Sequence, residues 1–159
     1  MGQRLCLSAE AVVERYSGTV YRLAYSMVRS KSDADDIFQE VFLRYVRKKP
    51  AFESEEHCKA WLLRVTINCA KKYWASSWVR RTEGLSDSLS FTLPEESAVD
   101  AALQALPSGD RSIIHLYYYE GYSTAEIAAM LGLRESTART RLTRARDKLR
   151  GLLKGESDV

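Results

Sequence analysis

The chain has 159 residues, of which 45% are hydrophobic and 28% charged, and its formal net charge is +3. This composition is ordinary for a soluble globular protein. The three cysteines form no closely spaced pair, which argues against a disulfide framework. No apolar run approaches the roughly 20 residues of a membrane span, so we expect a cytoplasmic protein.

Charge is unevenly distributed along the chain. Between Arg134 and Lys154 lie eight basic and two acidic side chains, and residues 71–81 hold four basic side chains and no acidic one. Acidic residues gather instead in 33–40 and again in 83–100. Clustering of one sign is typical of a polyanion-binding surface, although solvated helix faces explain such runs equally well.

Three helices are predicted in the N-terminal half. The first begins near Ser8 and places apolar residues three and four positions apart up to Val28. Ser32 is predicted to cap the second helix, whose acidic first turn suits the positive end of the helix dipole. This helix ends before Lys49 and Pro50. Its apolar stripe comprises Ile37, Phe38, Val41, Phe42, Tyr45 and Val46.

The third helix is predicted from about Ser54 to about Trp78, and it mixes basic with aromatic residues. Trp61 lies on its apolar stripe, so we expect this ring in the core. The later part carries Lys71, Lys72, Tyr73, Trp74 and Trp78. Lysines can follow a nucleic-acid backbone while rings stack on unpaired bases, so this set suits single-stranded DNA. Burial of the last three rings in the core is an equal alternative.

Residues 79–97 differ in character from the helices on either side. They read VRRTEGLSDSLSFTLPEES, without clear periodicity, which predicts a flexible linker. The chain is therefore expected to form two small domains, 1–78 and 98–159. Four apolar linker residues could lie along a partner surface or pack on their own domain: Leu85, Leu89, Phe91 and Leu93.

Helices are predicted to resume over about 99–106 and 109–120, with Gly121 as a stop. A helix-turn-helix pattern follows. Ser123 and Glu126 have the spacing of a capping box, and Gly132 supplies the turn. The first of the two helices is expected to bury Ile127 and Leu131.

The second helix of this motif is predicted to begin near Ser136. Its apolar stripe comprises Ala138, Leu142, Ala145, Leu149 and Leu152. In helix-turn-helix proteins this helix lies in the major groove with its N-terminal residues at base edges. The base-edge candidates are Glu135, Ser136, Thr137, Arg139 and Thr140, and the phosphate candidates are Arg144, Arg146 and Lys148. A basic amphipathic helix on a solvated surface is the alternative.

No catalytic or metal constellation is apparent. His57 stands beside Cys58, but adjacent side chains on a helix point apart, and no third ligand has a useful spacing for zinc. His115 is isolated as well. A Ser-His-Asp arrangement and a glycine-rich phosphate loop are both missing. We expect no enzymatic activity, no cofactor and no metal.

Three segments together resemble one family. DADDIFQEVFLR, AWLLRVTINCAKKYW and, after the linker, ALPSGDRSIIHLYYYEGYSTAEIAAMLGLRESTARTRLTRARDKLR are similar to the extracytoplasmic-function (ECF) class of the bacterial sigma-70 family. The resemblance covers about Ser8 to Leu153. It implies an all-α fold with a sigma region 2 helical bundle in 1–78 and a sigma region 4 helix-turn-helix in 98–159. It also implies a sigma factor that directs RNA polymerase core enzyme to promoters.

The resemblance further implies roles for particular residues. The second helix would dock on RNA polymerase through Asp35, Asp36, Gln39, Glu40 and Arg44. The melted −10 element would be held by Asn68, Lys71, Lys72, Tyr73 and Trp74. The −35 element would be read by Glu135, Ser136, Thr137, Arg139, Thr140, Arg141, Arg144 and Arg146. The segment ASSWVRR after Trp74 is less densely basic than in many members. Many relatives are held inactive by an anti-sigma factor, so we expect such a partner.

Two other functions remain open at this point. A helix-turn-helix regulator that binds duplex DNA without polymerase explains residues 122–153 but leaves the acidic helix and the KKYW segment unexplained. A sigma mimic that occupies polymerase without directing it would carry the same docking helix. Transcription with core enzyme separates these alternatives.

Overall fold

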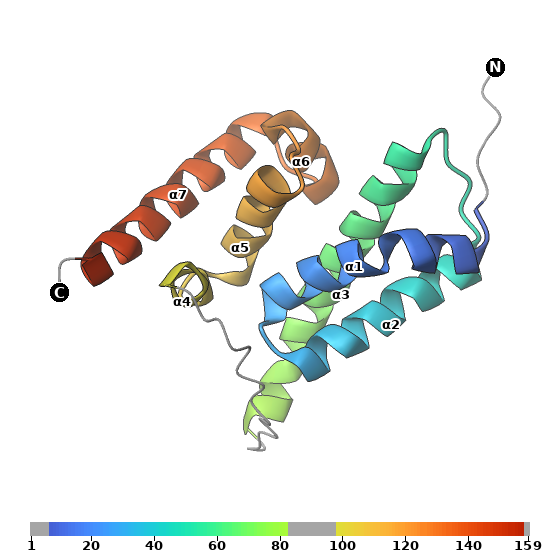
Figure 1. Cartoon of the computed structure of the whole chain (residues 1–159), viewed down its shortest axis with the longest axis horizontal. Coiled ribbons are helices and arrows are strands. Elements are labelled where there is room, and N and C mark those ends of the chain that lie inside the picture. The colour runs from blue at the N-terminus through green and yellow to red at the C-terminus, as the bar shows by residue number, and fades with distance from the viewer. Residues whose placement is uncertain (1–6, 83–97, 158–159) are drawn as a thin grey trace. The chain divides into compact units, whose positions relative to one another are not determined.

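The computed structural model describes residues 7–82 and 98–157 (Figure 1). The chain divides into two compact units, Met1–Trp78 and Val79–Val159. The regular structure of the described residues is helical, and the expected all-α fold is confirmed. No helix in the described ranges is long and apolar enough to span a membrane.

The first unit contains α1 (Ala9–Val28), α2 (Lys31–Lys48) and α3 (Glu55–Thr82). Helix α1 begins next to Ser8, as predicted, and Ser8 caps it, because its side chain accepts a hydrogen bond from the Ala11 N–H at 3.2 Å. The cap predicted for α2 is wrong. Ser30, rather than Ser32, accepts the Asp33 N–H at 3.3 Å. Arg29 ends α1 in a left-handed conformation with φ of 54°, which turns the chain directly into α2.

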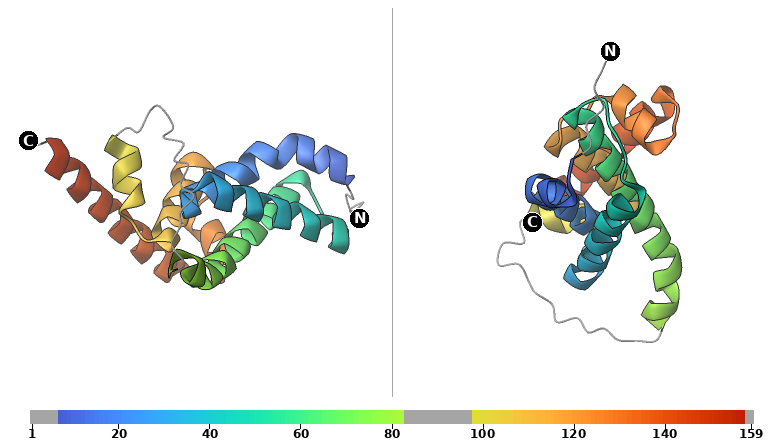
Figure 2. Two further views of the ribbon diagram at one scale, coloured as in Figure 1. Left: turned by 90° about the horizontal axis from the view of Figure 1, so that it is seen from below. Right: turned by 90° about the vertical axis from the view of Figure 1, so that its right-hand side faces the viewer.

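The core of this unit forms where α1 and α2 lie side by side (Figures 1 and 2). Each of the three helices buries one apolar stripe. Residues at most 2% exposed include Val12, Val20, Leu23, Met27, Ala34, Ile37, Val41, Leu62, Leu63 and Ile67. Arg15 on α1 and Glu55 on α3 form an ion pair near the beginnings of their helices. This packing leaves the opposite face of α2 exposed.

The boundary of the predicted linker shifts in the structure. Helix α3 continues to Thr82, so the first four residues of the expected 79–97 linker are helical. The remaining part, 83–97, lies outside the described residues, and so do the four apolar residues considered there.

The second unit contains α4 (Ala98–Gln104), α5 (Ser108–Ile114), the π-helical turn η1 (His115–Tyr119), α6 (Thr124–Leu131) and α7 (Glu135–Ser157). Helix α5 continues into η1, so the single helix expected over 109–120 is present but changes its hydrogen bonding. The Glu120 N–H donates to the His115 carbonyl at 3.0 Å, which is the wider spacing of a π-turn. Gly121 then ends the helix with φ of 78°.

The helix-turn-helix pattern is confirmed in α6 and α7. Ser123 and Glu126 make both capping-box bonds, at 3.0 and 3.1 Å. These bonds favour the carboxylate, so the backbone and then the side chain of Ser123 hold the pKa of Glu126 below its ordinary value. Gly132 makes the turn with φ of 69°.

Two details of the predicted apolar stripes in this motif are wrong. In α6, Ile127 is buried as expected, but Met130 is buried in place of the half-exposed Leu131. In α7, the stripe holds through Ala138, Leu142 and Ala145, but Leu152 is 39% exposed. Leu153 is half-buried instead and lines a groove near Tyr118.

Arg111 on α5 is a buried cation that closes the end of α4. It is 6% exposed, and its Nη1 donates to the Leu106 carbonyl at 2.6 Å and to the Gln104 carbonyl at 3.3 Å. Carbonyls at a helix C-terminus have no partner within the helix. The guanidinium therefore satisfies polar groups that burial would otherwise leave unpaired.

We predict that Arg111→Met destabilises the second unit by about 2 kcal/mol, because the methionine fills space but leaves those carbonyls without a donor. Chemical unfolding of the full chain measures the loss. Arg144→Met, an exposed change on α7, is the matched control and should stay within about 0.5 kcal/mol of the parent. Equal stability of both variants would contradict the assigned role of Arg111.

Candidate polymerase-binding and DNA-binding surfaces

The predicted polymerase residues lie on α2, whose inner face is fixed in the core by Ala34, Ile37 and Val41. Asp36 and Gln39 are exposed, whereas Asp35, Glu40 and Arg44 are half-buried. The last two pair with each other, since Arg44 Nε donates to Glu40 Oε1 at 3.1 Å.

The outer face of α2 continues beyond these residues as an apolar surface that the sequence analysis missed. Leu43 is 47% exposed and Val46 is 49% exposed. Together with Asp36 and Gln39 they are spaced three, four and three apart, so they share one helix face. Val46 was expected on the inner stripe. This prediction is wrong, because Val46 lies about one quarter turn around the helix from the buried Tyr45. Polar and apolar side chains thus form one continuous strip, which we call the α2 outer face.

The residues predicted for the −10 element lie on α3. Asn68, Lys71 and Lys72 are exposed. Tyr73 is half-buried, and its hydroxyl donates to Asp33 Oδ1 at 2.6 Å, with Asp36 Oδ2 at 3.3 Å. Trp74 lies in α3, but its side chain is outside the described set, and the same holds for Trp78.

Asn68 also opens onto a pocket of about 490 Å³ between α2 and α3 that the sequence analysis did not predict. The pocket is lined by Arg44, Arg47, Lys48, Trp61, Arg64, Val65 and Asn68. Four of these seven side chains are cationic, so the pocket suits an anion. The lining comes from two separate stretches of sequence, 44–48 on α2 and 61–68 on α3, and the packing of α3 on α2 brings them together.

Trp61 supplies the aromatic wall of this basic pocket. The indole meets the rings of Tyr45 and Phe52 edge to face, each with a centroid distance of 5.9 Å. Its expected place in the core is thus only half correct, because the ring is half-buried and also faces the pocket. Edge-to-face packing holds an indole rigidly, which makes its free surface a suitable wall against a planar ligand.

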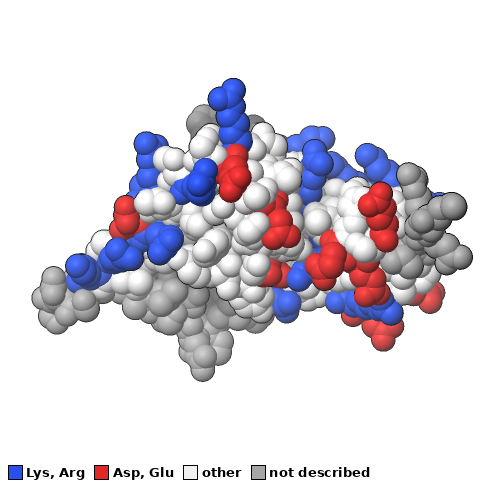
Figure 3. Space-filling model, turned by 90° about the horizontal axis from the view of Figure 1, so that it is seen from above, with Lys and Arg blue, Asp and Glu red and all other residues white. Residues whose placement is uncertain are grey.

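The predicted −35 residues lie along α7, where Figure 3 shows lysine and arginine side chains following the helix. All are exposed except Thr137, which is half-buried. At about 100° per residue they do not share one face. Ser136, Thr140 and Arg144 lie opposite the buried stripe, whereas Arg139 and Arg146 lie on one flank and Arg141 on the other. The Thr140 hydroxyl donates to the Ser136 carbonyl at 2.9 Å.

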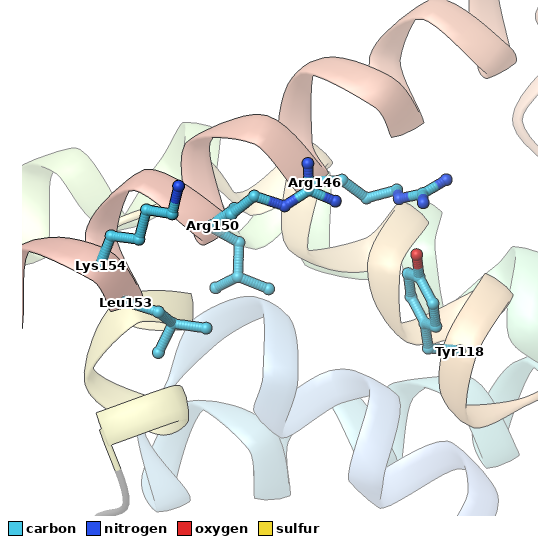
Figure 4. A pocket seen from close by; sticks show the side chains of 6 residues that line it. Tyr118, Arg146, Arg150, Leu153 and Lys154 are labelled. Carbon is cyan, nitrogen blue, oxygen red and sulfur yellow. The ribbon is translucent and has the colours of Figure 1, made fainter. Parts of the chain in front are cut away.

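Arg146 belongs to a groove of about 510 Å³ on the flank of α7 (Figure 4). Its guanidinium carbon lies 5.9 Å from the ring centroid of Tyr118, a cation–π distance. The groove is lined by Tyr118, Arg146, Leu149, Arg150, Leu153 and Lys154. It combines an apolar floor with a basic rim.

Within the described residues, no group of three potential metal ligands comes together. His57 Nδ1 instead accepts the Glu53 N–H at 3.3 Å, and the imidazole packs edge to face on Phe52. Burial raises the pKa of the Cys58 and Cys69 thiols. Both are therefore protonated at neutral pH and pack as small apolar side chains.

The fold and these surfaces define a two-unit helical protein with a DNA-binding helix-turn-helix. The family model for "Sigma-70 region 2" matches residues 12–80, and that for "Sigma-70, region 4" matches residues 96–149. ECF RNA polymerase sigma factor SigW of Bacillus subtilis is 30% identical over 163 residues, which cover 90% of this chain and 87% of SigW. The chain belongs to the ECF class of the sigma-70 family of RNA polymerase sigma factors.

A further relative and two solved structures are similar to this chain. Probable RNA polymerase sigma factor RfaY of Xanthomonas campestris is 31% identical, and the match covers 89% of this chain but 39% of RfaY. CnrH, solved in complex with the cytosolic domain of CnrY, has a TM-score of 0.67 and 25% identity over 92% of this chain and 88% of CnrH. RpoE of Bartonella quintana, solved with the anti-sigma factor NepR, shares the fold with a TM-score of 0.71 at 23% identity, over 91% of this chain and 96% of RpoE.

Arg144 and Arg146 lie on different sides of α7, so we expect them to contribute differently to DNA binding. We predict that Arg144→Ala lowers the slope of log affinity against log salt by about 1 on any duplex, as loss of one phosphate contact does. Arg146→Ala should change this slope less, because its guanidinium is directed along the groove toward Tyr118. Titration of labelled duplex at several salt concentrations measures both. The reverse order would place the DNA on the Arg146 flank.

Proposed function

We propose that this chain directs RNA polymerase core enzyme to promoters by dividing the work among three surfaces. The α2 outer face binds polymerase, the basic pocket and α3 hold the opened −10 element, and α7 reads the −35 element. The observation that carries this proposal is on the first unit: α2 presents an acidic and apolar strip, while the neighbouring pocket is lined by four cationic side chains.

The composition of the α2 outer face supports a protein partner for that surface. A strip with exposed Leu43 and Val46 beside Asp36 and Gln39 has little attraction for a phosphate backbone. Apolar centres with polar neighbours are instead typical of protein interfaces. The carboxylate of Asp36 favours a basic partner surface, which fits the docking role implied for this helix.

The basic pocket supports a single-stranded nucleic acid as its ligand. Arg44, Arg47 and Arg64 offer forked donors for phosphate oxygens, and Trp61 offers an aromatic face for an unpaired base. Asn68 adds both a donor and an acceptor for a base edge. A pocket of this kind accepts a base that has left the duplex, which is the state of DNA in a melted promoter.

The second unit supports duplex recognition. Ser136, Thr140 and Arg144 project from the exposed side of α7, with Arg139 at its edge, near the N-terminus that enters the major groove in helix-turn-helix proteins. Arginine can donate two hydrogen bonds to a guanine edge, and threonine can contact bases or phosphates. We propose that these side chains, with Glu135 and Thr137, select the upstream promoter element.

We also propose an anti-sigma partner, the cytoplasm as the site of action and no enzymatic activity, since sigma factors are regulators. CnrH, a relative with 25% identity, is bound by the cytosolic domain of CnrY. On this chain the groove with Leu149 and Leu153 below Arg146, Arg150 and Lys154 suits a partner helix with apolar residues flanked by carboxylates.

Run-off transcription from a promoter library with purified core polymerase tests the proposed function. The chain is expected to produce discrete start sites, whereas core enzyme alone gives none at those positions. Binding to core without any start site would show a sigma mimic. Specific binding to duplex DNA without core enzyme, again with no start site, would show an ordinary helix-turn-helix regulator.

The α2 outer face makes a separate prediction. Asp36→Ala with Glu40→Ala should weaken core polymerase binding by roughly 1–3 kcal/mol, and Val46→Ala by a further amount of about 1 kcal/mol, as expected for residues near an interface centre. Glu14→Ala, an exposed acid on α1, is the control and should bind as the parent does. Fluorescence titration with labelled core enzyme measures the affinities, and parental affinity of the α2 variants would refute the docking surface.

Substitution of Arg139 tests the proposed role of α7 in reading the −35 element. If it reads a base, Arg139→Ala should cost about 1–3 kcal/mol on the preferred −35 sequence and relax discrimination at one position. Competition among duplexes that differ at single base pairs measures both effects. An equal loss on all sequences would instead make Arg139 a phosphate contact.

A further inference from the structure

Tyr73 connects the two surfaces of the first unit. Its hydroxyl donates to Asp33 Oδ1 at 2.6 Å and lies 3.3 Å from Asp36 Oδ2, so one phenolic proton faces two carboxylates on α2. A bond of 2.6 Å from a hydroxyl to a carboxylate is of the short, charge-assisted kind. It joins residues 40 positions apart in the sequence.

The place of Tyr73 on α3 explains why it faces α2. Thr66 and Ala70 are both fully buried, and Tyr73 follows them at spacings of four and three, so it continues the buried face of the helix. Lys71 and Lys72, by contrast, are exposed. The ring of Tyr73 is therefore directed toward the neighbouring helix rather than presented with the lysines.

Asp33 is held in a fixed position at the other end of this bond. It lies in the first turn of α2, where its backbone N–H is bound by the Ser30 side chain at 3.3 Å. A carboxylate there is also stabilised by the helix dipole. A rigid acceptor and a donor with few rotatable bonds make a well-defined link between the helices.

We propose that Tyr73 is a positioning residue whose hydroxyl, bound to Asp33, sets where α3 presents Asn68, Lys71 and Lys72 to the opened promoter strand. This inference rests on the proposed function and refines it, because the resemblance implies direct contact of Tyr73 with DNA. The two roles differ in which part of the side chain matters. Base stacking needs the ring, whereas positioning needs the hydroxyl.

Two substitutions separate the roles. Tyr73→Phe keeps the ring and removes the donor, and Tyr73→Leu removes both. The experiment uses the full chain with core polymerase and measures promoter opening by the fluorescence of 2-aminopurine placed in the −10 element. Positioning predicts that Tyr73→Phe lowers opening by roughly tenfold, the effect of losing one hydrogen bond to a charged group, and that Tyr73→Leu lowers it no more than about threefold further. Parental opening by Tyr73→Phe would overturn the inference, whether or not Tyr73→Leu is impaired.

A double-mutant cycle with Asp33 distinguishes positioning from a general loss of structure. Asp33→Ala should impair opening in the parent chain but add little in the Tyr73→Phe chain, because the shared bond is already absent. Additive losses would overturn the inference. Affinity for core polymerase should stay within about twofold for Tyr73→Phe, since the α2 carboxylates remain, whereas a misfolded unit would lose it.

Promoter opening by the parent chain distinguishes a failure of this inference from a failure of the proposed function. If the parent opens no promoter with core enzyme, the proposed function fails. If the parent opens the promoter and Tyr73→Phe opens it equally well, only the positioning role fails.

Discussion

The packing of one face of α2 into the core determines which α2 side chains the first unit exposes for binding. Ala34, Ile37 and Val41 are at most 2% exposed, so the side chains on the opposite side of the same helix have to face outward. Those side chains are the carboxylate of Asp36, the amide of Gln39 and the aliphatic groups of Leu43 and Val46. Because α3 packs beside α2 with its own exposed lysines, two surfaces of different chemistry lie within the width of two helices.

Some side chains join these two surfaces through direct contacts. Arg44 lines the basic pocket and pairs with Glu40, and Tyr73 bonds to Asp33 with Asp36 close by. Ligands that use neighbouring groups of one rigid unit influence each other, and the effect on affinity is reciprocal. We therefore expect a partner that engages the α2 carboxylates to alter the surroundings of the α3 residues proposed to hold DNA.

Local sequence signals accounted for much of the fold. The Ser123–Glu126 capping box and the glycines at 121 and 132 act over a few residues, so they could be read directly. The cap of α2 was assigned to Ser32, although Ser30, two residues earlier, is the residue that caps it. Contacts between segments that are distant in the sequence could not be predicted from such local signals. The pocket around Trp61 and the bond from Tyr73 to Asp33 depend on which helices become neighbours. Val46 was misplaced because an apolar residue gives the same signal whether it meets the core or a partner. The π-turn η1 had no evident signal in its sequence.

We propose that the α2 outer face meets protein while the exposed part of α3 meets opened DNA. Site-specific photocrosslinking in a transcription complex tests it most directly, with a photoreactive amino acid placed at the position of Leu43 in one chain and of Lys71 in another, both exposed in the structure. We expect crosslinks from position 43 to polymerase and from position 71 to the −10 region of the promoter. Crosslinking of position 43 to DNA, or of position 71 to polymerase alone, would contradict it.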